Sequence, residues 1–247
     1  MKIPYPVLIK RTEDTPKWLP VVTSVGAVLL AFIISGIVLA ATGADPFKIY
    51  SYLYKASFGS WGAFSDVIVK ATPLLLIGLG CSLAFRMRLW NIGAEGQFFV
   101  GAFMASAVVM VPLVNLETTP TWAIISLMAV LGMVGGALYA FIPGILKAKL
   151  NINEIITTLM LNYIAVLWNN YWIFGNWSEA GFQMTKTFPK VAWLPRLADY
   201  AKQVPAFSGM TLHVGILFGL IAAVIVYLII YRSKWGYKIT LIGDNPR

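Results

Sequence analysis

The sequence predicts an all-α, polytopic integral membrane protein with about six membrane-spanning helices, one or more of them short or broken. Hydrophobic residues make up 59% of the 247 residues, only 12% are charged, and the mean hydropathy is +0.76. Soluble globular domains have far more charge and less apolar character. About 20 apolar residues cross a bilayer as a helix. Six segments approach this length, at 19–42, 67–85, 97–114, 122–146, 155–175 and 211–231, and we expect them to form a single domain, 1–247.

Three of these segments are uninterrupted, and three are not. Segment 19–42 is longer than the apolar region of a signal peptide, so it predicts a retained helix, and segments 122–146 and 211–231 are equally continuous. Segment 67–85 is short and contains Pro73 together with several glycines. Segment 97–114 opens directly out of a polar turn, and segment 155–175 contains several Asn and Thr residues. The three interrupted segments are therefore where we expect functional residues.

Three segments outside the apolar runs have their own patterns. Aromatic residues recur at helical spacing within 46–60, which predicts an interfacial helix. The longest polar interval, 176–210, contains Pro189, Pro195 and Pro205 together with Trp177 and Trp193, which are suited to the headgroup region. This outer loop is either a simple connector or a surface for a partner. The last segment, 232–247, is basic at its start.

The distribution of Lys and Arg predicts which side of the membrane each end occupies. If the N-terminus is cytoplasmic, twelve of the nineteen basic residues fall on the cytoplasmic side. Cytoplasmic loops of membrane proteins carry this excess, so we expect both termini inside and the 176–210 loop outside. The net charge of +9 is then a signal of topology. We expect no nucleic-acid partner, because no basic run is interleaved with a stacking surface.

The first candidate site is the polar turn NIGAEGQ between two apolar runs. Backbone that leaves helical geometry at membrane depth is tolerated only where protein or a water-filled path satisfies it. We therefore predict a solute path at this turn. Glu95 either lines or gates this path or only caps the following helix, where the helix dipole favours an anion. The predicted path residues here are Asn91, Gly93, Glu95, Gly96 and Gln97.

The second candidate site is a polar stripe on the fifth apolar segment. Glu154, Thr158, Asn162 and Asn169 are spaced by four, four and seven residues, which keeps them on one helix face. Such a stripe faces protein or water, because unsatisfied polar groups in hydrocarbon are costly. The stripe either lines the solute path or forms interhelical hydrogen bonds.

Several function classes are disfavoured by what the sequence lacks. It contains no GxxxxGK[ST] phosphate loop, so we expect any ATP to be bound by a separate subunit and no cofactor in this chain. Cys81 and His213 are the only residues of their types, which predicts neither a metal site nor a nucleophile–base pair. We expect that the protein is not an enzyme. A gradient-driven transporter or channel, and less favourably a membrane-embedded enzyme, stay open as alternatives.

Three stretches resemble the permease subunits of bacterial ABC importers of the ribose, branched-chain amino acid and nucleoside type, in particular the simple-sugar and nucleoside branch. They are RLWNIGAEGQFFVGAF (88–103), KLNINEIITTLMLNYIA (149–165) and SKWGYKITLIGDNPR (233–247). The resemblance implies import of a small polar solute, a nucleoside or a simple sugar, through the bacterial cytoplasmic (inner) membrane. It also implies three kinds of partner: a second permease subunit, a cytoplasmic ATPase dimer and an extracytoplasmic solute-binding protein.

The resemblance also implies a role for the last segment. In such permeases a cytoplasmic loop of this kind contacts the ATPase and transmits its closure to the membrane. The matching residues are Trp235, Gly236, Tyr237, Gly243, Asn245 and Arg247. Family members continue beyond this loop into further membrane helices. The resemblance therefore implies that the sequence is a fragment or a truncated product.

The predicted orientation is tested with impermeant thiol reagents. In a Cys81→Ser background, we expect Lys186→Cys to be labelled on intact cells, because position 186 lies in the outer loop. Lys147→Cys is the control on the opposite side and should stay unlabelled until the cells are opened. Labelling of position 147 but not of position 186 on intact cells would reverse the orientation.

Overall fold

The computed structural model describes residues 16, 18–111, 113–179, 181–182 and 184–244. In this part of the chain the regular structure is helical, and the only β-type pairs are isolated bridges between Ser178 and Thr185 and between Arg196 and His213. The chain divides into two compact units, 1–60 and 61–247. Each unit is described by itself.

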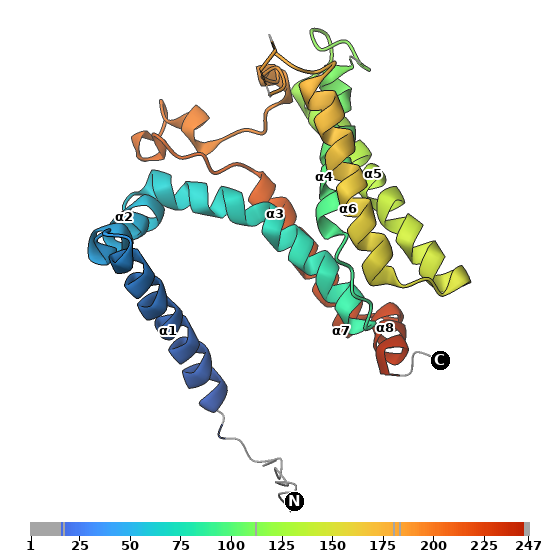
Figure 1. Ribbon diagram of the computed structural model, residues 1–247. Helices are drawn as coiled ribbons and strands as arrows, with labels where there is room; N and C mark the ends of the chain where they lie inside the picture. Colours follow the sequence, from blue (N-terminus) through green and yellow to red (C-terminus); the bar gives the residue numbers. More distant parts are fainter. Residues whose placement is uncertain (1–15, 17, 112, 180, 183, 245–247) are drawn as a thin grey trace, which may run out of the picture. The chain divides into compact units, whose positions relative to one another are not determined.

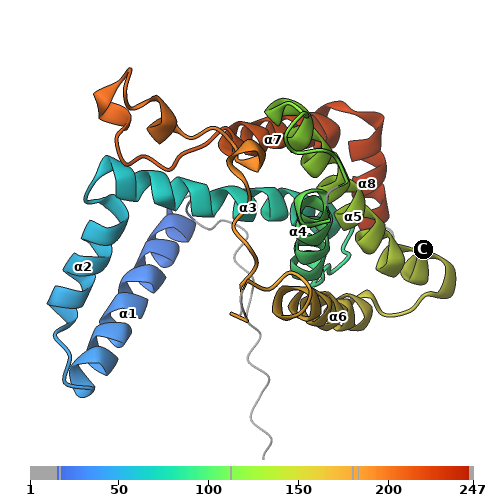
Figure 2. The same ribbon diagram turned by 90° about the horizontal axis from the view of Figure 1, so that it is seen from above.

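The first unit is a hairpin of two helices, α1 (Leu19–Ala41) and α2 (Pro46–Phe58) (Figures 1 and 2). Asp45 begins α2, because its carboxylate accepts hydrogen bonds from the backbone N–H groups of Phe47 and Lys48. The Tyr50 hydroxyl donates to the Phe32 carbonyl at 2.7 Å, and the two rings meet edge to face. No residue of α1 is buried, as expected of a helix whose apolar surface faces lipid.

The second unit contains a group formed by α3 (Trp61–Arg86), α7 (Gly215–Arg232) and α8 (Lys234–Asp244). Figures 1 and 2 show α3 and α7 side by side. The helix α3 begins before the expected residue 67 and runs through Pro73 without a break. The absence of a side chain at Gly219 lets α7 approach Leu75 and Thr72 of α3. Near the start of α3, the Ser65 hydroxyl oxygen accepts a hydrogen bond from the backbone N–H of Thr211, which lies shortly before α7, at 2.9 Å.

The other group consists of α4 (Ala94–Met110), α5 (Thr121–Leu150) and α6 (Glu154–Phe174). Glycines bring α4 and α5 into backbone contact. A Cβ atom added to Gly132 would lie 3.2 Å from the Gly101 carbonyl oxygen, and one added to Gly136 would lie 3.2 Å from the Gln97 carbonyl oxygen. The glycines of α5 therefore form the small surface that such close helix packing requires.

The helix α8 occupies a segment for which the sequence predicted the start of a loop. It packs against α7 and the end of α3. A Cβ atom on Gly243 would overlap the Arg86 carbonyl oxygen, so only glycine permits this contact. The helix is amphipathic, with Gly236 and Gly243 buried and Trp235 and Tyr237 exposed, and this pattern explains why the segment folds as a helix on the bundle.

The outer segment between α6 and α7 contains three short 3₁₀ turns, η1 (Lys190–Ala192), η2 (Leu197–Tyr200) and η3 (Pro205–Phe207). The turn η1 packs on α5. Ala192 joins Val108, Val109 and Ile124 in a buried cluster, and Phe188 and Val191 lie against it. This part of the predicted outer loop is therefore anchored to the helices.

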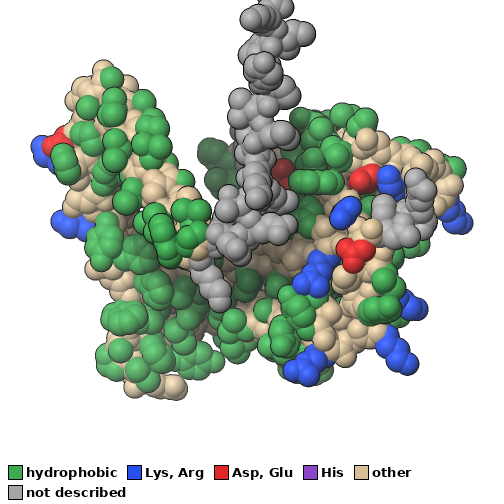
Figure 3. All heavy atoms as spheres, turned by 90° about the horizontal axis from the view of Figure 1, so that it is seen from below, with side chains coloured by type: hydrophobic (Ala, Val, Ile, Leu, Met, Phe, Trp, Pro, Cys, Tyr) green, Lys and Arg blue, Asp and Glu red, His purple; other side chains and the backbone are tan. Residues whose placement is uncertain are grey.

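Within the residues that the structure describes, four helices are long and apolar enough to cross a membrane: α1, α3, α5 and α7. The helix α4 has 17 residues, and α6 has 21 but includes several polar ones. Figure 3 shows one face on which hydrophobic side chains dominate and a smaller number of Lys and Arg side chains are exposed. The protein is thus an all-α, multi-pass membrane protein.

The contact between α4 and α5 predicts a position-specific response to substitution. We expect Gly132→Val to lower the free energy of unfolding by about 1–3 kcal/mol, because the new side chain forces the helix backbones apart. Gly78→Val is the matched control, since a Cβ atom at Gly78 meets nothing within 4 Å. Thermal unfolding of both variants in detergent measures the difference. Equal unfolding temperatures would contradict the close packing.

Candidate functional site

The predicted polar turn joins α3 to α4 and is organised by a pair of side-chain amides. Asn91 Nδ2 donates to Gln97 Oε1 at 3.1 Å, and Gln97 Nε2 donates to Asn91 Oδ1 at 3.1 Å. Asn91 Oδ1 also accepts from the Gly93 backbone N–H at 3.0 Å. The three residues therefore form one hydrogen-bonded unit at the start of α4.

The first turn of α4 is capped by a residue of another helix. Gly93 occupies the N-cap position, where it has no side chain to accept a hydrogen bond. Asn162 of α6 supplies the acceptor, because its Oδ1 accepts from the Gly96 N–H at 2.8 Å. Asn162 Nδ2 in turn donates to the Ile92 carbonyl at 2.8 Å. Asn162 thus satisfies one buried N–H of the first turn of α4 and one carbonyl of the preceding turn.

The glycines of the turn allow this approach. A Cβ atom on Gly93 would lie 2.9 Å from Thr158 Cβ, and one on Gly96 would lie 2.8 Å from Asn162 Oδ1. Both glycines are buried. In the structure these two glycines therefore permit close contact between the turn and α6.

Glu95 lies in the same first turn but points away from this interface. Its side chain is exposed, and within the part of the chain that the structure describes it forms no ion pair. Arg86, one possible partner, instead donates to the Tyr231 hydroxyl at 2.9 Å and lies over the Tyr231 ring. The geometry at Glu95 suits stabilisation of the helix dipole.

The polar stripe of α6 faces α4. Thr158, Asn162 and Asn169 are only 3%, 8% and 7% exposed. Asn169 Nδ2 donates to the Ala165 carbonyl at 2.9 Å and to the Phe99 carbonyl of α4 at 3.4 Å. The Thr158 hydroxyl donates to the Glu154 carbonyl at 2.6 Å. Of the two readings of this stripe, its geometry corresponds to interhelical hydrogen bonding.

Glu154 is the first residue of α6, directly after the turn that follows α5. Asn151 ends α5 in the left-handed conformation, and Asn153 begins α6 by accepting from the N–H groups of Ile155 and Ile156. This turn brings Glu154 to 3.0 Å from Lys147 Nζ. Glu154 lies just before the expected membrane span 155–175. Hydrogen bonds to its carboxylate from its own backbone N–H and from Lys147 lower the pKa of this carboxyl group.

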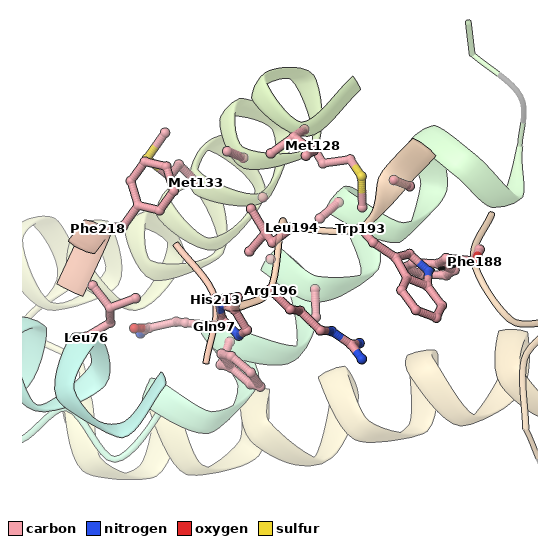
Figure 4. Close-up of a pocket in the computed structure, with 18 residues that line it drawn as sticks. Leu76, Gln97, Met128, Met133, Phe188, Trp193, Leu194, Arg196, His213 and Phe218 are labelled. Atoms are coloured by element: carbon pink, nitrogen blue, oxygen red, sulfur yellow. Dashed lines mark hydrogen bonds between the residues drawn. The ribbon is translucent and has the colours of Figure 1, made fainter. Parts of the chain in front are cut away.

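A cavity of about 740 Å³ lies on the opposite side of α4. Its walls come from α3, α4, α5, α7 and the outer segment, and Gln97 is the predicted path residue that reaches it. In the view of Figure 4, the side chains of Gln97, His213 and Arg196 follow one another across the cavity, below Met128 and Met133. Its volume is typical of a small-molecule site, as is its largely apolar lining with a few polar groups.

The outer segment contributes a wall that the sequence did not indicate. The Arg196 guanidinium lies 4.7 Å from the centre of the Trp193 ring, and Trp193 Nε1 donates to the Phe188 carbonyl at 2.8 Å. His213 Nδ1 accepts from the Gly215 N–H at 3.0 Å, and burial, then the nearby Arg196 charge, lowers the pKa of this imidazole. The residues carried no catalytic or ligand motif, so only their positions in space identify them.

The predicted ATPase-contacting residues divide into two kinds. Trp235 and Tyr237 are 71% and 68% exposed, whereas Gly236 and Gly243 are buried against α7 and α3. Asn245 and Arg247 lie outside the described residues. The described part of this segment thus combines two exposed aromatic side chains, on either side of the buried Gly236, with a fixed attachment to the bundle.

Comparison with known proteins identifies relatives along most of the chain. Residues 63–247 match the family described as branched-chain amino acid transport system / permease component. The chain is 34% identical over 238 residues to a glucose ABC transporter permease protein of Haloferax volcanii, covering 94% of this chain and 61% of the relative. It is 32% identical over 223 residues to a guanosine ABC transporter permease protein of Bacillus subtilis, covering 89% and 60%.

A nucleoside ABC transporter permease protein of Lactococcus lactis is 29% identical over 232 residues, with 89% of this chain and 60% of the relative covered. The chain thus spans about 60% of the length of these curated relatives. No solved structure matches it.

The cap provided by Asn162 predicts a loss of stability when it is removed. We expect Asn162→Leu to reduce the free energy of unfolding by about 1–3 kcal/mol, because the buried Gly96 N–H loses its acceptor. Asn170→Leu on the same helix is the control, since the side chain of Asn170 makes no hydrogen bond within the described residues. Thermal unfolding compares the two. A greater loss in the control would show that this cap contributes little.

Proposed function

Because the chain belongs to the family of branched-chain amino acid transport system permease components, we propose that it is the membrane-spanning component of an ATP-driven importer. Members of this family are permeases and not enzymes. The solute in this proposal is a nucleoside or a simple sugar, since the relatives are named for glucose, guanosine and nucleoside transport. The single observation that carries the proposal is the cavity lined by α3, α4, α5, α7 and the outer segment.

The cavity has the position that a solute path requires. It lies where the α3–α7 group meets the α4–α5–α6 group, and the contacts between α3 and α4 are far fewer than those within either group. Ligand sites form preferentially at such junctions between helices. Relative movement of the two groups would open and close the cavity while each group keeps its packing.

We assign the predicted path residues different tasks within this proposal. Gln97 contacts the solute, and Asn91, Gly93 and Gly96 hold the start of α4 that carries it. Thr158, Asn162 and Asn169 support the same helix from α6. Glu95 and Glu154 are proposed to act at the entrance, where they are close to the ends of their helices.

The partners and orientation follow from the same proposal. A cytoplasmic ATPase dimer binds ATP, a second permease subunit completes the path, and an extracytoplasmic binding protein delivers the solute. Arg86, Lys147, Lys149 and Arg232 lie in the last turns of their helices, and Lys and Arg side chains are exposed on the face seen in Figure 3, which supports a cytoplasmic position of these helix ends. The corresponding location is the bacterial cytoplasmic membrane, with both termini inside.

The proposal is tested by uptake in cells that express the chain together with its transport partners. We expect uptake of radiolabelled nucleoside or glucose to require both this chain and an ATPase with an intact phosphate loop. Uptake that survives loss of ATP hydrolysis but collapses with the membrane gradient would support a gradient-driven transporter instead.

The exposed aromatic side chains of α8, Trp235 and Tyr237, are predicted to couple the permease to the ATPase. We expect the double change Trp235→Ala and Tyr237→Ala to lower solute uptake at least about tenfold, with little change in the unfolding temperature, because exposed truncations rarely destabilise. Trp122→Ala, at an equally exposed tryptophan (72%) of α5, is the control. Normal uptake and normal solute-stimulated ATP hydrolysis in the double variant would exclude this coupling role.

A further inference from the structure

We propose that the two helix groups of the second unit, α3–α7–α8 and α4–α5–α6, rotate about a line that joins two short chain crossings. One crossing is the tether formed by residues 193–196 of the outer segment, and the other is the turn between α3 and α4. The inference rests on the proposed function, since it assumes that the cavity changes shape during transport. It goes further by naming the residues about which that change takes place.

The first half of the outer segment is attached to the α4–α5–α6 group. Trp177 is 7% exposed, and its ring stacks on Phe103 of α4 with the ring centres 4.9 Å apart. Further along, Ala192 is buried in the cluster that α4 and α5 form, and Phe188 packs against the same cluster. Trp193 stays on this side, because its Nε1 donates to the Phe188 carbonyl.

The second half of the outer segment is attached to the α3–α7–α8 group. The backbone N–H of Thr211 donates to the hydroxyl oxygen of Ser65 on α3, which is buried, and the Thr211 hydroxyl donates to the Asp66 carboxylate. The Leu197 N–H donates to the Leu212 carbonyl at 2.8 Å. The backbone that follows the tether is therefore bonded to the residues that lead into α7.

The tether between these halves is short. Trp193 is held by the first group, whereas Arg196 pairs with His213 in an isolated bridge on the side of the second group. Only Leu194 and Pro195 lie between them, so the Cα atoms of Trp193 and Arg196 can be at most about 11 Å apart. Figure 1 shows the outer segment running from the α4–α5–α6 side to the side of α3 before it enters α7.

The second crossing is shorter still. Leu89 belongs to the end of α3, because its N–H donates to the Ala84 carbonyl at 3.0 Å. Asn91 belongs to the other group, because its side chain is paired with Gln97 of α4. Only Trp90 lies between them. Along the described residues after 60, the chain therefore passes between the groups at two places, and both passages are tight.

The two crossings lie at opposite ends of α3 and restrict how the groups can move. Ser65 is near the start of α3 and Arg86 is its last residue, which places them about 30 Å apart along the helix. The groups cannot separate at either end, and the direct contacts between them are few. They remain free to turn about the line that joins the crossings, as in a hinge formed by a few residues at helix ends. The cavity lies between the groups, so this rotation changes its width.

Distances between spin labels test the rotation independently of transport. In a Cys81→Ser background, one pair of labels at Lys190→Cys and Lys202→Cys flanks the tether, and another at Met133→Cys and Phe218→Cys lies on α5 and α7 at the cavity. Between the nucleotide-free and the ATP-trapped state of the complete complex, we expect the distance between positions 133 and 218 to change more than that between positions 190 and 202. Equal changes, or no change at the cavity, would overturn the rotation.

Lengthening the tether tests whether the rotation drives transport. Two glycines inserted between Leu194 and Pro195 keep both attachments but let them move apart. We expect uptake to fall about tenfold while ATP hydrolysis continues, because movement of one group is transmitted less completely to the other. The same insertion between Lys202 and Gln203 is the matched control, since these residues are exposed and lie outside the tether. It should leave uptake near the wild-type level.

If the tether insertion fails to accumulate in the membrane, Arg196→Gln replaces it. This variant keeps the backbone of the tether but removes the cation that lies over the Trp193 ring. We expect a broader distribution of distances between positions 190 and 202 and a lower uptake. An unchanged distribution together with unchanged uptake would overturn the proposal.

The outcomes separate the two levels of the proposal. If the wild-type complex imports neither nucleosides nor sugars in an ATP-dependent manner, the proposed function fails, whereas the label distances still decide on the rotation. If the complex imports a solute and the tether insertion transports as well as its control, the function stands and the inference on the tether is overturned.

Discussion

The hydrogen bonds between Asn162 and the start of α4 are the interaction on which the rest of the second unit depends. A helix that begins inside a membrane protein has backbone N–H groups that no water satisfies. Asn162 accepts a hydrogen bond from the Gly96 N–H and donates one to the Ile92 carbonyl. Its side-chain amide therefore binds the backbone on both sides of the N-cap residue, Gly93. This fixes α4 on α6, and α4 in turn presents its opposite face to the cavity.

Two faces of one helix therefore perform two different tasks. Toward α6, α4 is held by glycine contacts and buried amides, whereas toward the cavity it contributes Gln97, Phe98 and small residues. The glycine contacts between α4 and α5 fix the position of this cavity-lining face relative to α5. The α3–α7–α8 group forms the other side, and Gly243 seats α8 directly on the carbonyl at the end of α3. A displacement of α8 would consequently move α3 and α7 together.

The sequence predicts much of the fold, because the helices are encoded by local apolar runs and by caps such as Asp45 and Asn153. It also places polar residues of α6 on one face, but spacing alone cannot tell a water-lined face from a packed one. The packed partner of Asn162 lies 66 residues away at Gly96, which no local pattern reveals. A loop was predicted where α8 forms. The packing of α8 depends on contact of Gly243 with the distant Arg86 carbonyl, and the local sequence does not reveal such a contact.

The cavity was hidden from sequence reasoning for a related reason. Its walls come from five separate segments, and most of its lining is small or apolar. In a chain this rich in hydrophobic residues, such side chains look the same whether they face lipid, another helix or a cavity. Gln97 was identified because it belongs to a polar turn between two apolar runs, whereas Trp193 indicated only the headgroup region and His213 showed no metal or catalytic pattern.

The buried amides of α6 also have a consequence for biosynthesis. On its own, a helix with Thr158, Asn162 and Asn169 on one face enters lipid less readily than an entirely apolar helix. The helix that accepts these groups, α4, precedes α6 in the chain and therefore leaves the ribosome first. Insertion of α6 is then expected to depend on α4 remaining next to the translocon. Because α4 is synthesised before α6, it is present as the packing partner when α6 enters the membrane.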